Sequence, residues 1–361
     1  MKYLKVPTVS IFRNKDEVSS TEDDFDFTLI DSATSHVEIL GSREARVWEL
    51  LSEFPERASL MAKYSLETSE FEDTFVDKLL QKWIEVGFVL PEGKQVRRQN
   101  LTWWQRLIWI EFSVNNLDKY FAKLYQKVFR SLATWPVYAL AIGLISSGAY
   151  LGVVSIIYGQ VNLFQQLDLG LFVLILALGL FFLSIHEAAH GIAMKWAGAP
   201  IIRAGVALYL GLPVLFVDTS TIWASPRRQR VITAAAGIFA NTTIAAACIW
   251  LTYIVSQPFL NAVLWEIVLI NIFMAGFSAI PFLKLDMYYI LMDMTGIPNL
   301  GSLAYSNLKN LVTSPFAFGY SLRNLLLVIF AILSGIGSFL LLIYSILYWG
   351  RLIAAFVHFV I

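Results

Sequence analysis

The sequence is poor in cysteine, histidine and charge. Its 361 residues include one cysteine, Cys248, and four histidines. A single cysteine excludes an intramolecular disulfide and a cysteine-rich metal site. Charged residues make up 15% of the chain and apolar residues 57%, and several apolar runs exceed the roughly 18 residues that suggest a membrane span. This composition excludes an ordinary soluble protein and predicts an integral membrane protein.

The charges that are present divide unequally along the chain. Residues 1–95 hold 11 of the 27 Lys and Arg and 19 of the 27 Asp and Glu, a net charge of −8, which leaves +8 for residues 96–361. The change falls near the turn-like Pro91-Glu92-Gly93. We therefore expect a soluble domain over 1–95, an amphipathic interfacial linker over 96–132 and a membrane domain over 133–361.

Residues 1–95 show the pattern of a small α+β domain. A hairpin is predicted over 25–40 with its turn at 32–35, followed by helices from Ser42, over about 56–64 and from about Ser69 to Gly87, and then a strand over 88–90. This order is winged-helix-like. A winged helix can bind DNA, but the net charge of −8 argues against contact with phosphates. No nucleic-acid partner is expected.

The remaining residues predict a polytopic helical membrane protein. The linker mixes aromatic and basic residues, which favours a helix lying on the headgroup surface of the lipid bilayer; a helix packed on the soluble domain is the alternative. Residues 201–217 are apolar but broken by glycine and proline, so a re-entrant or β-like segment is expected there. Residues 349–361 either extend the last span or turn back, giving five to six spans. The expected spans are 134–158, 169–195, 230–255, 260–283 and 323–348.

Basic residues predict the orientation of these spans. The loops over 159–168 and 256–260 contain no Lys or Arg, whereas the linker and the loops over 195–230 and 284–323 contain several. By the positive-inside rule, the soluble domain and the basic loops lie in the cytoplasm of a multi-pass cell-membrane protein.

The predicted span over 169–195 contains His186-Glu187-Ala188-Ala189-His190. Histidines four residues apart share one helix face and can bind one Zn²⁺, and Glu187 can reach a water on that ion without being a ligand. A buried, hydrogen-bonded cluster is the alternative. Glu187 is costly inside a membrane helix, which requires a functional or pairing reason. The motif therefore predicts a zinc site with Glu187 as the general base.

A catalytic zinc usually has a third protein ligand, and depth in the membrane narrows the choice. His186 follows Gly170 by 16 residues, about 24 Å of helix, which is the cytoplasmic third of a core about 30 Å thick. Asp286, just after the helix-breaking Pro281, lies at a compatible depth and is the favoured third ligand. Asp218, on the facing loop, is the alternative.

These motifs resemble the site-2 protease family of intramembrane zinc metalloproteases, and more closely its bacterial branch of peptide zinc metalloproteases. That branch has a stretch like PLLKLDGYYALSDLLGIPNL, and residues 281–300 here read PFLKLDMYYILMDMTGIPNL. Residues 236–241 (AGIFAN) resemble the family's AGPxxN, and residues 213–223 (PVLFVDTSTIW) resemble its PxFYxDxSxxW. The resemblance implies His186, His190 and Asp286 as zinc ligands, Glu187 as the base and Asn241 as a further catalytic residue.

Two residues depart from the family pattern. Met287 stands where a glycine usually follows the aspartate, and Ile238 replaces a proline. The methionine adds bulk beside the expected ligand, which puts the shape of the pocket in question more than metal binding.

The first 95 residues resemble a second family, the domains that recognise leader peptides of ribosomally synthesised, modified peptides. The resemblance rests on FDFTLIDSATSHVEILGSREARVWELL and FVDKLLQKWIEVGFV. It implies that an extended leader peptide adds as a strand to the hairpin edge.

Together these expectations describe an intramembrane zinc endopeptidase that matures a ribosomally made peptide precursor. One alternative is a protease of a membrane-anchored regulator. Another is a non-proteolytic immunity or export partner that binds the peptide without cutting it. A transporter as a further partner stays open.

Overall fold

The computed structural model describes residues 2–6, 9–13, 27–31, 36–68, 73–92, 109–115, 117–132, 134–164, 169–209, 212–297, 300–315 and 319–360. The chain divides into two compact units, which are described separately. The N-terminal unit comprises Met1–Leu107 with Asp218–Gln229, and the membrane unit comprises Ile108–Val217 with Arg230–Ile361.

The N-terminal unit combines short antiparallel strands with three helices. Strands β1 (Tyr3–Lys5) and β5 (Val89–Pro91) form one pair, and β2 (Val9–Arg13), β3 (Phe27–Asp31) and β4 (His36–Leu40) form a sheet in the order β2-β3-β4. The helices are α1 (Ser42–Glu53), α2 (Arg57–Thr68) and α3 (Asp73–Val86). The predicted hairpin strands and helices therefore occur, whereas β1 and β2 were not predicted. The predicted turn at 32–35 lies outside the described residues.

Aromatic side chains form the core of this unit. Trp83 and Phe88 are fully buried, and the Trp48 ring meets Trp83 edge-on with centroids 5.1 Å apart. Gly87 has φ +88°, a left-handed conformation that suits glycine, and it ends α3 so that Phe88 turns back into the core. The N-terminal unit thus has its own hydrophobic core.

Five helices in the described residues are long and apolar enough to cross a membrane. They are α7 (Trp135–Ile157), α8 (Leu169–Ala197), α9 (Arg227–Thr252), α10 (Pro258–Ser278) and α13 (Leu322–Val360). The prediction of a polytopic helical membrane protein is confirmed at this level. Residues 349–360 continue α13, which is the first of the two alternatives, an extension of the last span.

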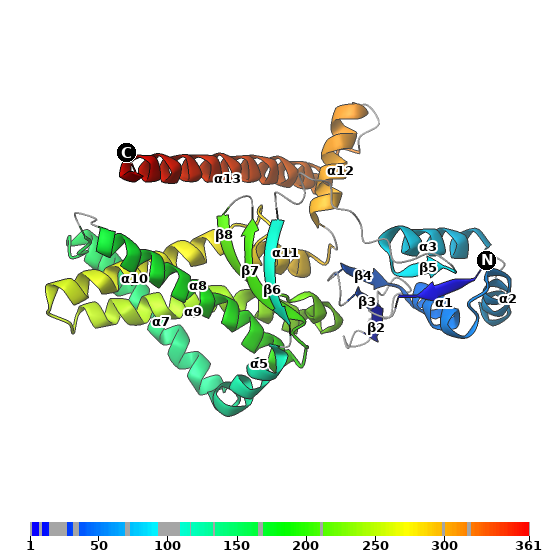
Figure 1. Ribbon diagram of the computed structural model, residues 1–361, viewed down its shortest axis with the longest axis horizontal. Coiled ribbons are helices and arrows are strands. Elements are labelled where there is room, and N and C mark those ends of the chain that lie inside the picture. The colour runs from blue at the N-terminus through cyan, green and yellow to red at the C-terminus, as the bar shows by residue number, and fades with distance from the viewer. Residues whose placement is uncertain are drawn as a thin grey trace. The chain divides into compact units, whose positions relative to one another are not determined.

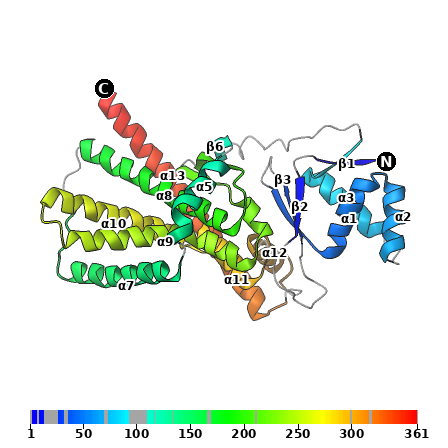
Figure 2. The same cartoon turned by 90° about the horizontal axis from the view of Figure 1, so that it is seen from below.

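Helices α7, α9 and α10 run alongside one another in Figure 2, and in Figure 1 α7 crosses the other two at an angle. Gly148 of α7 allows this packing, because a Cβ atom there would lie 2.6 Å from Ala246 Cβ of α9. Cys248 of α9 is buried with Trp265 and Val268 of α10. The lone cysteine is therefore a packing residue of the helix bundle.

A three-stranded sheet accompanies the helices of the membrane unit (Figure 1). Strands β6 (Trp109–Asn115), β7 (Arg203–Tyr209) and β8 (Leu212–Val217) are antiparallel in the order β6-β7-β8. The β-like segment expected over 201–217 is the β7–β8 hairpin. The expectation of a helix throughout the linker is wrong for residues 109–115, where β7 satisfies the backbone hydrogen bonds of β6. Helical structure follows as α5 (Asp118–Leu124), the π-helical turn η1 (Tyr125–Phe129) and α6 (Arg130–Leu132).

The segment after α10 is more regular than predicted. Helix α10 ends at Ser278, five residues before the predicted end at 283. Helices α11 (Asp286–Thr295) and α12 (Leu300–Thr313) occupy much of the predicted loop over 284–323. Tyr288, Ile290 and Met292 of α11 are buried, so tertiary packing stabilises this short helix. Asp286 is its first residue.

Candidate metal centre

Helix α8 presents two histidines one turn apart. His186 and His190 are both 5% exposed, and their Nε2 atoms lie 3.3 Å apart. The spacing of four residues places both imidazoles on one helix face. Two lone-pair nitrogens thus face the same point in the protein interior.

Asp286 of α11 lies against both of these nitrogens. Its Oδ2 is 3.2 Å from His186 Nε2 and its Oδ1 is 3.4 Å from His190 Nε2. As the first residue of a helix, Asp286 also has a position that favours a negative charge. The alternative, Asp218, accepts the backbone N–H of Ser220 at 3.0 Å and so caps its own loop. Of the two aspartates, Asp286 is the one paired with the histidines.

The spacing of these three residues fits a zinc ion. Zinc bonds of about 2.0–2.1 Å in a tetrahedron place the ligand atoms about 3.3–3.4 Å apart. The distances between the two Nε2 atoms and from them to the carboxylate are 3.2, 3.3 and 3.4 Å. Asp286 Oδ2 is buried and receives no hydrogen bond from the described residues. A cation between the three side chains would satisfy that oxygen, whose burial without a partner is otherwise costly.

Two residues of α9 orient the imidazoles. His190 Nδ1 lies 2.8 Å from the Thr233 carbonyl, which accepts its N–H and leaves Nε2 unprotonated. His186 Nδ1 lies 3.1 Å from the side-chain amide of the fully buried Asn241. The Asn241 amide nitrogen faces Nδ1, and Asn241 Oδ1 is buried without a partner among the described residues; the flipped amide, with Oδ1 accepting from Nδ1–H, satisfies that oxygen and leaves His186 Nε2 unprotonated. Asn241 therefore contacts His186 and positions its imidazole.

Glu187 differs from Asp286 in its hydrogen bonding. Its Oε2 accepts the backbone N–H of Val217, the last residue of β8, at 2.9 Å. A carboxylate oxygen of Glu187 also lies within 4.8 Å of the ligand nitrogens of His186 and His190, a separation that one water can bridge. The Val217 N–H satisfies Glu187, whereas Asp286 Oδ2 has no such donor. This contrast favours Asp286 as a ligand and Glu187 as a proton acceptor beside the site.

Gly237 of α9 is a site residue to which sequence reasoning gave no role. A Cβ atom there would lie 2.5 Å from His186 Nε2 and 2.7 Å from His190 Nε2. Any other residue would thus fill the space that the two nitrogens face. The sequence does contain one indication of this role. Gly237 lies four residues before Asn241 in AGIFAN, and this spacing places both residues on the α9 face towards α8.

A buried ion pair holds the helix that carries Asp286. Arg230 Nε of α9 donates to Asp293 Oδ1 of α11 at 2.7 Å, and the two side chains are 16% and 5% exposed. At the start of α12, the Gly301 N–H donates to the Tyr288 hydroxyl at 3.0 Å. These contacts fix α11 relative to α9 and α12. Met287, between Asp286 and Tyr288, is partly buried.

The arrangement joins ligands from α8 and α11 with positioning groups from α9. Chemically it offers three donor side chains for a divalent cation and a separate carboxylate that can move a proton. Comparison with known proteins found no match to any family model, to any curated protein or to any solved structure.

Proposed function

We propose that this protein is an intramembrane zinc endopeptidase in which His186, His190 and Asp286 bind Zn²⁺ and Glu187 is the general base. The observation that carries the proposal is that the Asp286 carboxylate of α11 lies 3.2–3.4 Å from the Nε2 atoms of His186 and His190, which are 3.3 Å apart on α8, a helix long and apolar enough to span a membrane. In the alternative, a structural His/Asp cluster, a protonated His186 Nε2 would have to donate to Asp286 Oδ2; the two atoms lie 3.2 Å apart but without the geometry of a hydrogen bond.

The chemistry divides between the ion and Glu187. When bound, zinc polarises the scissile carbonyl and lowers the pKa of water towards about 7. Glu187 accepts a proton from the attacking water and returns it to the leaving amine nitrogen. The Val217 N–H holds the Glu187 carboxylate beside the site. The Thr233 carbonyl keeps His190 in the ligating tautomer, and Asn241 does the same for His186 when its amide oxygen is turned towards Nδ1.

The sheet of the membrane unit supplies a way to present a peptide. In the order β6-β7-β8, β8 is an edge strand, and its last residue is hydrogen-bonded to Glu187. A helical substrate hides its carbonyl groups, so the segment to be cut must first become extended. A peptide that adds to β8 as a further strand would carry its carbonyl groups past Glu187.

The substrate class follows from the N-terminal unit. Its sheet in the order β2-β3-β4 with three helices suits a winged-helix-like peptide-binding domain, and the net charge of −8 over residues 1–95 disfavours nucleic acid. We place this unit and the open side of the metal site in the cytoplasm, because the loops rich in Lys and Arg share that side. The substrate proposed is a ribosomally made peptide precursor with an extended leader.

The test compares full-length protein with the Glu187→Gln variant in cells, using mass spectrometry of membrane-associated peptides and zinc analysis of the purified proteins. The variant is expected to keep its zinc and to lose cleavage products by about 10²–10⁴-fold, the usual contribution of a general base. Unchanged products with zinc bound would exclude proteolysis by this site.

Deleting residues 1–95 is expected to remove only products from leader-bearing precursors; loss of every product equally would favour cleavage of membrane-anchored regulators.

A further inference from the structure

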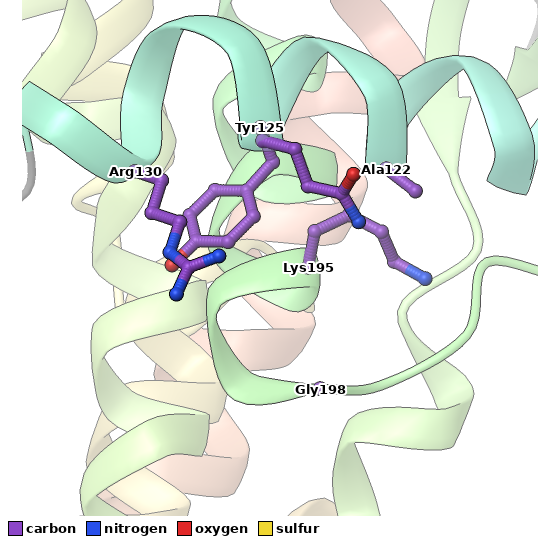
Figure 3. A pocket seen from close by; sticks show the side chains of 6 residues that line it. Ala122, Tyr125, Arg130, Lys195 and Gly198 are labelled. Carbon is purple, nitrogen blue, oxygen red and sulfur yellow. The ribbon is translucent and has the colours of Figure 1, made fainter.

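A polar cavity lies between the linker helices and the end of α8. Its volume is about 460 Å³, within the roughly 300–1,000 Å³ of most ligand pockets. Figure 3 shows Arg130 and Tyr125 extending from the linker helices towards the turn of α8 that carries Lys195. The lining residues are Ala122, Tyr125, Gln126, Arg130, Lys195 and Gly198.

The linker is fixed to α8 by contacts around the cavity. The Phe121 ring packs on Gly191, where a Cβ atom would lie 2.4 Å from Phe121 Cε1. Asp118 Oδ1 accepts the Ile201 N–H at 2.7 Å and is also bonded to Lys195 Nζ. Between these anchors and Arg130 the linker adopts the π-helical turn η1, in which the Arg130 N–H bonds to the Tyr125 carbonyl. Such turns widen a helix and often occur at functional sites.

Of the two basic residues that line the cavity, Lys195 has an acidic partner and Arg130 has none among the described residues. Burial raises the pKa of the Asp118 carboxyl, but the bonds from Lys195 and from the Ile201 N–H outweigh burial and lower it. Asp118 is therefore ionised and neutralises Lys195. Arg130 is exposed and has no acidic partner in the part of the chain that the structure describes. Its guanidinium donors, with the Tyr125 hydroxyl and the Gln126 amide nearby, suit a phosphate group.

The cavity lies at the level expected for lipid headgroups. Helix α8 has 29 residues, about 43 Å, so one end extends beyond a hydrocarbon core about 30 Å thick. Lys195 is near that end, eight residues beyond Glu187, or about 12 Å along the helix axis. The linker also exposes an apolar stripe at a spacing of four residues, which suits the boundary between headgroups and acyl chains. Its members are Tyr120, Leu124, Val128 and Leu132.

We propose that this cavity binds the phosphate of an anionic phospholipid, with Arg130 as its main ligand and the acyl chains against the apolar stripe. The charge on Lys119, Lys123 and Lys127, all exposed on the same helices, adds attraction for an anionic rather than a zwitterionic lipid. The site is separate from the metal centre and does not depend on the proposed protease activity.

The test titrates full-length, delipidated protein in detergent with phosphatidylglycerol or phosphatidylcholine and counts bound lipid by native mass spectrometry. Arg130→Gln is expected to weaken phosphatidylglycerol binding about tenfold, because it removes a charge-assisted contact. The matched control, Lys123→Gln, removes an exposed charge from the neighbouring linker helix α5 without changing the cavity lining and is expected to weaken binding less than about twofold. Because Arg130 is exposed, the unfolding temperature without lipid should be unchanged.

A second variant separates the cavity from general surface charge. Ala122→Leu fills the cavity while keeping every charge. Weaker phosphatidylglycerol binding in this variant supports the site. Unchanged binding in both Ala122→Leu and Arg130→Gln overturns it. Equal losses in Arg130→Gln and Lys123→Gln would mean diffuse surface attraction and also overturn it. Inorganic phosphate in excess should leave the lipid bound; displacement by phosphate would identify free phosphate as the ligand and overturn the lipid assignment.

Discussion

The two units bury opposite kinds of side chain. The N-terminal unit buries Trp83, Phe88 and Leu29 completely, as a protein in water does, whereas the membrane unit exposes residues such as Leu140 and Phe273 and buries His186, His190 and Asn241. In water, burial of apolar area stabilises the fold. In lipid the apolar residues already have a favourable environment, so a buried polar residue needs a partner or a function. The same degree of burial therefore reflects apolar packing in one unit and contacts between polar side chains in the other.

The largest expected effect is the loss of zinc from Asp286→Ala. Removal of the carboxylate leaves two imidazoles at the site, and we expect zinc affinity to fall by more than the roughly 10–100-fold typical of groups that only orient a ligand. Zinc analysis of purified full-length protein measures this. Asp218→Ala is the control, because Asp218 caps its own loop. If zinc content depends on Asp218 and not on Asp286, then Asp218 is the third zinc ligand and Asp286 is not.

Gly237→Ala tests whether the space between the histidines is the metal position. The added methyl would lie 2.5 Å from His186 Nε2, so the ligand triangle must open. We expect a drop in zinc affinity of at least about tenfold, measured by competition with a chelator. The control is Gly276→Ala in α10, where a Cβ atom meets nothing within 4 Å. Full zinc affinity in Gly237→Ala would mean that the metal, if bound, lies elsewhere.

Removing one partner of a buried ion pair shows how far the membrane unit depends on polar contacts. Asp293→Ala leaves Arg230 buried without this partner, which typically costs about 3–5 kcal/mol. We expect unfolding of the full-length protein at a lower mole fraction of detergent denaturant, with zinc affinity reduced because α11 carries Asp286. Restored stability in the double variant Arg230→Met/Asp293→Ala would attribute the cost to the Arg230 charge. An unchanged unfolding transition in Asp293→Ala would contradict a stabilising role for this pair.

Sequence reasoning succeeded where the determining signal was local. The five spans follow from apolar runs whose backbone groups bond within each helix, and the pairing of His186 with His190 follows from the pitch of one helix. The proximity of Asp286 to the histidines could be predicted because its expected depth in the membrane and the resemblance to the site-2 protease family both indicated it. Strand β6 was missed because its hydrogen-bonding partner, β7, is about 90 residues away in the chain, and strand preference depends on such partners.

The missed features of the site are also contacts between distant segments. The role of Gly237 emerges only when α9 packs against α8, and the bond from the Val217 N–H to Glu187 depends on where β8 ends. Asn241 was expected near the site, but its contact with His186 Nδ1 was needed to identify it as a positioning residue. Tertiary packing determines these features, and no single segment of sequence encodes them.

The smallest effect is expected at an exposed ion pair of the N-terminal unit, which can be compared with the buried pair of Arg230 and Asp293. Arg57 and Asp77 form a two-pronged pair in the N-terminal unit with 42% and 43% of their side chains exposed. The hydrogen bonds from Arg57 lower the pKa of Asp77 below its ordinary value of 3.8. Because the folded pKa is the lower one, the stabilisation is present above pH 3.8 and is lost as pH falls through the folded value. Solvent screening limits it to about 0.2–1 kcal/mol.

Asp77→Asn should therefore lower the free energy of local opening of α2 and α3 by about 0.2–1 kcal/mol at neutral pH. The difference from the unmodified protein should shrink once Asp77 is protonated in both the folded and unfolded states. Hydrogen exchange of peptides covering residues 57–68 and 73–86 measures this locally, and Glu53→Gln on α1 is a control for the loss of one surface charge. A loss as large as that in Asp293→Ala would mean that exposure does not separate the two pairs, and the contrast between the units would then need another cause.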